Sequence, residues 1–134
     1  MYSTIVNSAA LSTQKPKSEV IGAKSIEWIA GLFEGEGCLT YSKTAKFEGW
    51  DLKVQMTDSD VMWDLYQSLG CRGNLSALRK SPSRPDHWKP SMTWKTSRRD
   101  LIKEIVLEMY PYLGERRRAK IHDFLTWYDF KTSG

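Results

Sequence analysis

Two carboxylates set among glycines are the side chains of this sequence best placed to hold a metal ion. The stretch 28–37 begins as an apolar helix, with apolar residues at 26, 29, 32 and 33, and ends in Glu34-Gly35-Glu36-Gly37. The C-terminal end of a helix dipole repels negative charge, and a bound divalent cation would relieve that cost. A glycine cap followed by a solvated acidic turn fits the same residues.

One face of this expected helix is almost bare of side chains. Ala30, Gly31 and Gly35 supply it, and Gly31 and Gly35 share a face because they are four residues apart. Small residues in this spacing let a second backbone approach closely. We therefore expect the helix to pack against another element along this face.

The composition is that of one globular domain with a basic half. Of the 134 residues, 40% are hydrophobic, and six tryptophans add to the material for a core. The net charge is +4, and the excess of Lys and Arg falls between residues 72 and 120. Such a charge suggests a polyanionic partner, nucleic acid before membrane, although a solvated basic surface fits it equally well.

Other classes of site and segment are disfavoured by the sequence. Cys38 and Cys71 lie far apart with no Cys-x-x-Cys pair, which argues against a zinc module. No apolar run approaches the length of a membrane span, so no membrane partner is expected. Residues 1–24, rich in Ser, Thr and Lys, are expected to be a disordered lead to a single domain over 25–134.

Apolar periodicity predicts helices and strand pairs in alternation. After the first helix the expected elements are strands at 38–45 and 51–57, a turn at 46–49 between them, a helix at 58–69, strands at 74–78 and 91–95, and helices at 98–109 and 115–130. The tryptophans expected in the core are Trp28, Trp63, Trp94 and Trp127, with Trp50 and Trp88 partly buried near turns. Ala119 is expected on the inward side of the last helix.

The outward faces of the expected strands carry donors and cations, a surface suited to base edges and phosphates. Each threonine alone is common on any exposed strand, so the argument rests on the whole set. The side chains concerned are Thr40, Ser42, Thr44, Lys53, Gln55, Thr93 and Lys95.

The chain resembles the LAGLIDADG homing endonucleases. The residues Ile29–Gly37 are similar to the nine-residue motif of that family, and the αββαββα order that follows is also similar. The resemblance covers roughly residues 25–131. It implies an α+β fold with a saddle-shaped antiparallel sheet lying on DNA and helices packed on the other face.

The resemblance also implies roles for residues. It implies Mg²⁺, replaceable by Mn²⁺ or Ca²⁺, held by Glu36 and the Gly35 carbonyl beside the scissile phosphate, and no small-molecule cofactor. The family more usually has Asp at the position of Glu36. Because the chain carries one copy of the motif, it implies a homodimer, with an interface formed by Ala30, Gly31, Glu34 and Gly35.

Three further side chains are catalytic candidates through the resemblance. Asp58 matches the position that orients a water, but it is also expected to cap a helix. A basic residue after Pro111 would serve the phosphate, and the register leaves both Arg116 and Arg117 open. A run of arginines near a helix N-terminus opposes the helix dipole, which favours a phosphate role.

These features lead to one preferred function and two alternatives. The preferred one is an intracellular, Mg²⁺-dependent endonuclease that cuts a long, near-palindromic double-stranded DNA target, leaves 3′ overhangs and mobilises an intron. The alternatives are an RNA maturase or DNA-binding regulator on the same scaffold, and a basic domain with no nucleic-acid role. Additional DNA-binding candidates are Lys46, Arg72, Asn74, Ser76, Arg79, Lys80, Arg84 and Lys89.

Overall fold

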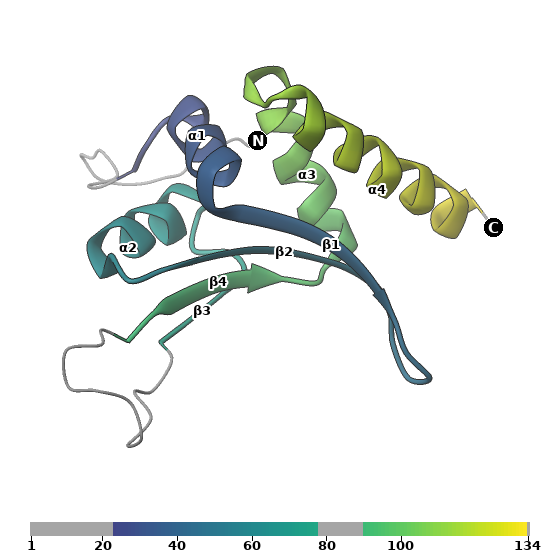
Figure 1. The fold of residues 1–134 in the computed structure, drawn as a ribbon, viewed down its shortest axis with the longest axis horizontal. Coiled ribbons are helices and arrows are strands. Elements are labelled where there is room, and N and C mark those ends of the chain that lie inside the picture. Colours follow the sequence, from purple (N-terminus) through teal and green to yellow (C-terminus); the bar gives the residue numbers. More distant parts are fainter. Residues whose placement is uncertain (1–22, 78–89, 134) are drawn as a thin grey trace. The chain divides into compact units, whose positions relative to one another are not determined.

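The computed structural model describes residues 23–77 and 90–133, and its elements follow the predicted order. In chain order they are α1 (Ile26–Glu36), β1 (Gly37–Lys43), β2 (Glu48–Met56), α2 (Ser59–Ser68), β3 (Asn74–Ala77), β4 (Met92–Thr96), α3 (Arg99–Met109), the 3₁₀ helix η1 (Tyr110–Tyr112) and α4 (Glu115–Ser133). Figure 1 shows these elements along the chain. The expected lead over 1–24 falls outside the described residues, apart from its last two positions.

The strands form one open four-stranded sheet in the order β1-β2-β4-β3, so the α+β fold class predicted from the sequence is confirmed. β1 and β2 pair antiparallel, with Leu39 opposite Leu52 and Thr40 opposite Asp51. Because successive side chains of a strand point to opposite faces, the leucine pair faces inward and is buried while Thr40 faces outward and is exposed.

The chain divides into two compact units, and β2 and β4 each pass from one unit to the other. One unit holds Ile26–Val54 and Lys95–Gly134, in which α1 packs against α3 and η1, and α3 packs against α4. Figure 1 shows α1, α3 and α4 on one side of the β1–β2 hairpin. The buried side chains of this unit include Phe33, Trp50 and Phe124, and the rings of Trp50 and Phe124 meet edge to face with their centres 5.7 Å apart.

The other unit, over the described parts of Gln55–Trp94, is built around Trp94 and α2. Trp94 is fully buried, and its Nε1 donates a hydrogen bond of 2.8 Å to the carbonyl of Arg72. Gly73 lies directly against that ring, has φ +88°, and would place a Cβ 2.5 Å from Trp94 Nε1. Glycine is therefore required at this turn for both space and backbone conformation.

Some local expectations are wrong. Trp63, placed in the core by its apolar pattern, is 51% exposed on α2, and Ala119 is exposed on α4. Trp50 is 5% exposed rather than partly buried, because α4 crosses the inward face of the hairpin above it. None of the helices in the described ranges is long and apolar enough to cross a membrane.

Candidate metal site and nucleic-acid interface

The two acidic residues of the glycine-rich stretch lie at the C-terminal end of α1, and their surroundings differ. Glu34 is half-buried and turned toward the helical layer, where it accepts a 2.7 Å hydrogen bond from the backbone N–H of Gly114. Glu36 is exposed, and its carboxylate forms no hydrogen bond or ion pair with any described residue. The first acid therefore fixes the end of the helix, and the second is left available to a ligand.

Gly37 allows the chain to turn directly from α1 into β1. A Cβ at this position would lie 2.5 Å from Phe33 Cδ1 and 2.8 Å from the Phe33 backbone. Such distances are far inside van der Waals contact, so any side chain here would push β1 away from the last turn of α1. The glycine thereby keeps Glu36 at a fixed place between the helix and the strand.

Arg117 binds backbone carbonyl groups at the end of α1. Its two terminal nitrogens donate hydrogen bonds of 2.7 Å to the Gly37 carbonyl and 3.0 Å to the Glu34 carbonyl. Its Nε lies 3.8 Å from a Glu34 carboxylate oxygen, an ionic contact too long for a hydrogen bond. The last carbonyls of a helix lack intrahelical partners, so the guanidinium closes α1 on both sides of Gly35 and Glu36.

Arg118 likewise binds backbone carbonyl groups, in this case those of η1. Its Nε donates to the Tyr110 carbonyl at 3.1 Å, a terminal nitrogen donates to the Pro111 carbonyl at 2.9 Å, and its guanidinium lies 5.1 Å from the centre of the Tyr110 ring. Two of the three consecutive arginines are therefore held by carbonyl groups. That arrangement accounts for their position near a helix N-terminus, where positive charge is otherwise unfavourable.

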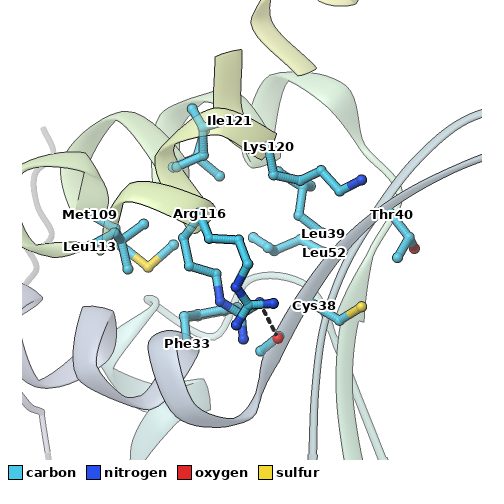
Figure 2. Close-up of a pocket in the computed structure, with 13 residues that line it drawn as sticks. Phe33, Cys38, Leu39, Thr40, Leu52, Met109, Leu113, Arg116, Lys120 and Ile121 are labelled. Atoms are coloured by element: carbon cyan, nitrogen blue, oxygen red, sulfur yellow. Dashed lines mark hydrogen bonds between the residues drawn. The ribbon is translucent and has the colours of Figure 1, made fainter. Parts of the chain in front are cut away.

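Arg116, in contrast, is exposed and has no hydrogen-bond or ion-pair partner in the described part of the chain. It lies at a pocket of about 200 Å³ between the end of α1, β1, α3 and α4. The walls of the pocket are mostly apolar, and Arg116 and Lys120 add positive charge beside Cys38 and Thr40 of β1. In Figure 2 the Lys120 amine extends toward Thr40. The dashed line marks the hydrogen bond that Arg117, not Arg116, donates to the Gly37 carbonyl.

The oxygen donors at the end of α1 fit a hard divalent cation, but only as part of a site. The Glu36 carboxylate and the Gly35 carbonyl are the donor types that Mg²⁺ and Ca²⁺ take, at the negative end of a helix dipole. Among the described residues, however, no three His, Cys, Asp or Glu side chains come together. The described residues of one chain supply a single free carboxylate here, so a complete centre needs further oxygen atoms.

Asp58 lies in the other unit, at the start of α2. It occupies the N-cap position, and its carbonyl accepts the Met62 N–H at 3.1 Å. Its exposed carboxylate makes no capping hydrogen bond. The side chain is therefore not used in the way that the capping interpretation expected.

The predicted dimer residues differ in what they can offer a partner. Gly31 and Gly35 are exposed, and a Cβ built on either would meet nothing within 4 Å. Ala30 is instead fully buried within its own protomer, so its side chain belongs to the core rather than to an outer seam. The helical repeat turns Ala30 inward with Ile29 and Phe33.

Most of the predicted DNA-binding side chains in the described ranges are exposed. Those exposed are Thr40, Ser42, Thr44, Lys46, Lys53, Gln55, Asn74, Ser76 and Lys95, while Thr93 and Arg72 are half-buried. Three of the set have structural partners. Thr44 Oγ1 accepts hydrogen bonds within the hairpin turn, Arg72 Nε donates to the Leu69 carbonyl at 2.8 Å, and Gln55 Nε2 donates to Ser91 Oγ at 3.1 Å. Arg79, Lys80, Arg84 and Lys89 lie outside the described residues.

Two candidates were not predicted, namely Asp51 on the outward face of the strands and Lys120 at the pocket beside Arg116. Asp51 lies on the outward face opposite Thr40, and its carboxylate accepts a hydrogen bond from the Ser97 hydroxyl. The alternation with Lys53 was enough to place it on that face. Lys120 could have been found from its position four residues after Arg116, since that spacing puts both on one side of a helix.

The fold is shared with solved DNA endonuclease structures. The homing endonuclease I-CvuI, in complex with its target and calcium, matches with TM-score 0.55 and 18% identity over 71% of this chain and 59% of that one. The LAGLIDADG meganuclease I-AabMI, bound to uncleaved DNA, matches with TM-score 0.63 and 14% identity over 83% of this chain and 38% of that one.

The group I intron-encoded homing endonuclease I-CeuI, complexed with DNA, matches with TM-score 0.58 and 16% identity over 81% of this chain and 56% of that one. The chain therefore spans less than two thirds of the length of each of these proteins. No protein-family model and no curated protein matches the sequence. The protein has the LAGLIDADG homing endonuclease fold, as its motif predicted.

Proposed function

We propose that the protein is a homodimeric, divalent-metal-dependent endonuclease that cuts a long, near-palindromic double-stranded DNA site. The observation that carries the proposal is the carboxylate of Glu36, which has no partner among the described residues and lies at the end of α1, while Glu34 and Arg117 are both used to fix that end. A structural turn has no need of an exposed carboxylate at the negative end of a helix.

We propose a dimer because the described residues of one chain provide too few oxygen ligands for a metal ion. One chain offers Glu36 and the Gly35 carbonyl, and two chains related by a two-fold axis would offer both pairs. The open face at Gly31 and Gly35 would let two α1 helices approach closely, which would bring the two Glu36 carboxylates near the axis. Two carboxylates related by symmetry are suited to cutting both strands of a palindrome.

The bound cation would stabilise charge on the attacking and leaving oxygens of the phosphodiester. Arg116 is proposed to hold a phosphate oxygen, because its guanidinium has no partner among the described residues, while Arg117 is used at the end of α1. The bond between Arg117 and the Gly37 carbonyl places the start of α4, and so Arg116, at the same end of the unit as Glu36. Asp58 is proposed to orient water, since its carboxylate is not a helix cap.

DNA would lie on the outward face of the strands. Thr40, Ser42 and Lys53 are exposed there, and their hydroxyl and amine groups match phosphates and base edges. I-CvuI was solved in complex with DNA in the presence of calcium and of magnesium, and I-AabMI was solved bound to DNA. We also propose that cleavage leaves 3′ overhangs and mobilises an intron.

The test uses supercoiled DNA that carries the joined sequences flanking the reading frame. The full chain should linearise this plasmid only when Mg²⁺ or Mn²⁺ is present, and Glu36→Gln should bind the site without cutting it. Asp129→Asn makes the same carboxylate-to-amide change at an exposed position near the end of α4, so it is the matched control and should still cut. Cleavage by Glu36→Gln at the parental rate would show that the metal assignment is wrong.

The binding alternative gives a different result in the same assay. A maturase or DNA-binding regulator would bind without cutting in any metal, and a maturase would bind the intron RNA at least as tightly as the DNA. Binding that does not weaken with salt would argue against both nucleic-acid functions, since phosphate contacts release counterions.

A further inference from the structure

The ring of Phe47 lies on the outward, polar face of the β1–β2 hairpin. Gly49 pairs with Ser42, whose side chain is exposed on that face. A Cβ on Gly49 would point to the same face and would lie 3.0 Å from Phe47 Cζ, with the two Cε atoms at 3.4 and 3.7 Å. Gly49 is buried although it faces outward, because the far edge of the Phe47 ring folds back over it.

The turn that carries Phe47 is held by its own hydrogen bonds. Thr44 Oγ1 accepts from the backbone N–H of Lys46 at 3.3 Å and of Phe47 at 3.1 Å, and the Thr44 N–H donates to the Phe47 carbonyl at 2.6 Å. The next residue, Glu48, is anchored by Tyr41 Oη at 2.6 Å and by a lysine of α4. The ring is therefore presented on a fixed turn and loses little freedom on binding.

Phe47 contributes exposed apolar surface where the surrounding side chains are polar. It is 41% exposed, and Figure 1 shows the hairpin turn projecting away from α3 and α4. The inward face of the hairpin already has its own aromatic residues, including buried Trp50. The protomer does not need the ring for its core, so the exposed part of the ring is available to a partner.

We propose that Phe47 reads thymine through its 5-methyl group, in the major groove at the outer part of each half-site. This inference rests on the proposed DNA-binding function. A two-stranded β-ribbon fits the major groove, where the thymine methyl is the one strongly apolar base group. Because the ring is folded against Gly49 rather than extended, it offers a flat patch to a methyl group and not a wedge for insertion between bases.

The experiment begins with selection of bound duplexes from a randomised DNA library by the full chain and by Phe47→Ser. The parent should enrich thymine at symmetric outer positions, and the variant should lose that preference while keeping the central sequence. Replacing those thymines by deoxyuridine, which removes only the methyl, should weaken parental binding about fourfold per half-site, the equivalent of one buried methyl group. The change should leave Phe47→Ser unaffected.

Two variants separate this contact from general loss of fold or surface. Phe47→Leu keeps an apolar side chain and should keep part of the methyl discrimination. Phe130→Ser removes an equally apolar ring, 74% exposed near the end of α4, and should behave as the parent. If the parent binds and cuts DNA, but deoxyuridine weakens binding by the parent and by Phe47→Ser equally, the inference is overturned and the proposed function stands. A parent that binds no duplex would overturn it together with the proposed function.

Discussion

Replacing Arg117 by Gln should destabilise the protein far more than replacing its neighbour Arg116. Arg117 donates hydrogen bonds of 2.7 Å to the Gly37 carbonyl and 3.0 Å to the Glu34 carbonyl, and Arg116 has no partner in the described ranges. The two substitutions remove the same charge from adjacent positions of one helix. Their difference therefore measures the bonds at the end of α1 and not the net charge.

The size of the effect follows from these contacts. Hydrogen bonds to charged groups contribute about 1.5–3 kcal/mol each, and the lower end applies because the Arg117 side chain is 23% exposed. The ion pair with Glu34 at 3.8 Å adds at most about 1 kcal/mol, because the Glu34 side chain is 41% exposed. Arg117→Gln should thus lose roughly 3 kcal/mol, which lowers Tm by roughly 12 °C in a domain of this size.

Thermal denaturation followed by circular dichroism measures this difference. Arg116→Gln should stay within about 0.5 kcal/mol of the parent, as is usual for surface substitutions, yet lose cleavage through its phosphate contact. Arg117→Lys should recover only part of the stability, since an ammonium cannot span two carbonyls as a guanidinium does. Equal Tm values for Arg116→Gln and Arg117→Gln would refute the assignment of the two arginines.

Three further predictions concern other parts of the same unit. Hydrogen bonds from Tyr41 and, to a smaller extent, Lys131 lower the pKa of Glu48 from 4.5 to about 2. The stability that the ionised carboxylate contributes is therefore present above pH 4.5 and is lost as the pH falls toward 2. The Tm measured across this range should fall less steeply in Glu48→Gln than in the parent. Gly37→Ala should cost about 1–3 kcal/mol in urea denaturation, because its methyl would overlap Phe33, and an unchanged midpoint would contradict that packing. Gly31→Ala should stabilise the monomer by up to about 1 kcal/mol through helix propensity but weaken dimer association in sedimentation, whereas a gain in both would exclude α1 as the seam.

The sequence by itself determined the order of elements and the direction in which most side chains point. Alternation in β1 and β2 placed Leu39 inward and Thr40 outward, since the period of a strand is two residues and one face must be buried. The helical repeat and the glycines placed Glu36 at the end of α1. These patterns are local, so one sequence is sufficient to read them.

Tertiary structure alone decided which polar groups are used and which are free. Neither spacing nor charge distinguishes Arg116 from Arg117, and only the approach of α4 to α1 gives one of them two carbonyl partners. Trp63 was misplaced because an apolar residue in a helical pattern is buried only if another element covers it. The place of Glu36 at the end of α1 was predicted from the local pattern, but the bonds that hold this end, at Glu34 and Gly37, come from residues some eighty positions away, which no local pattern records.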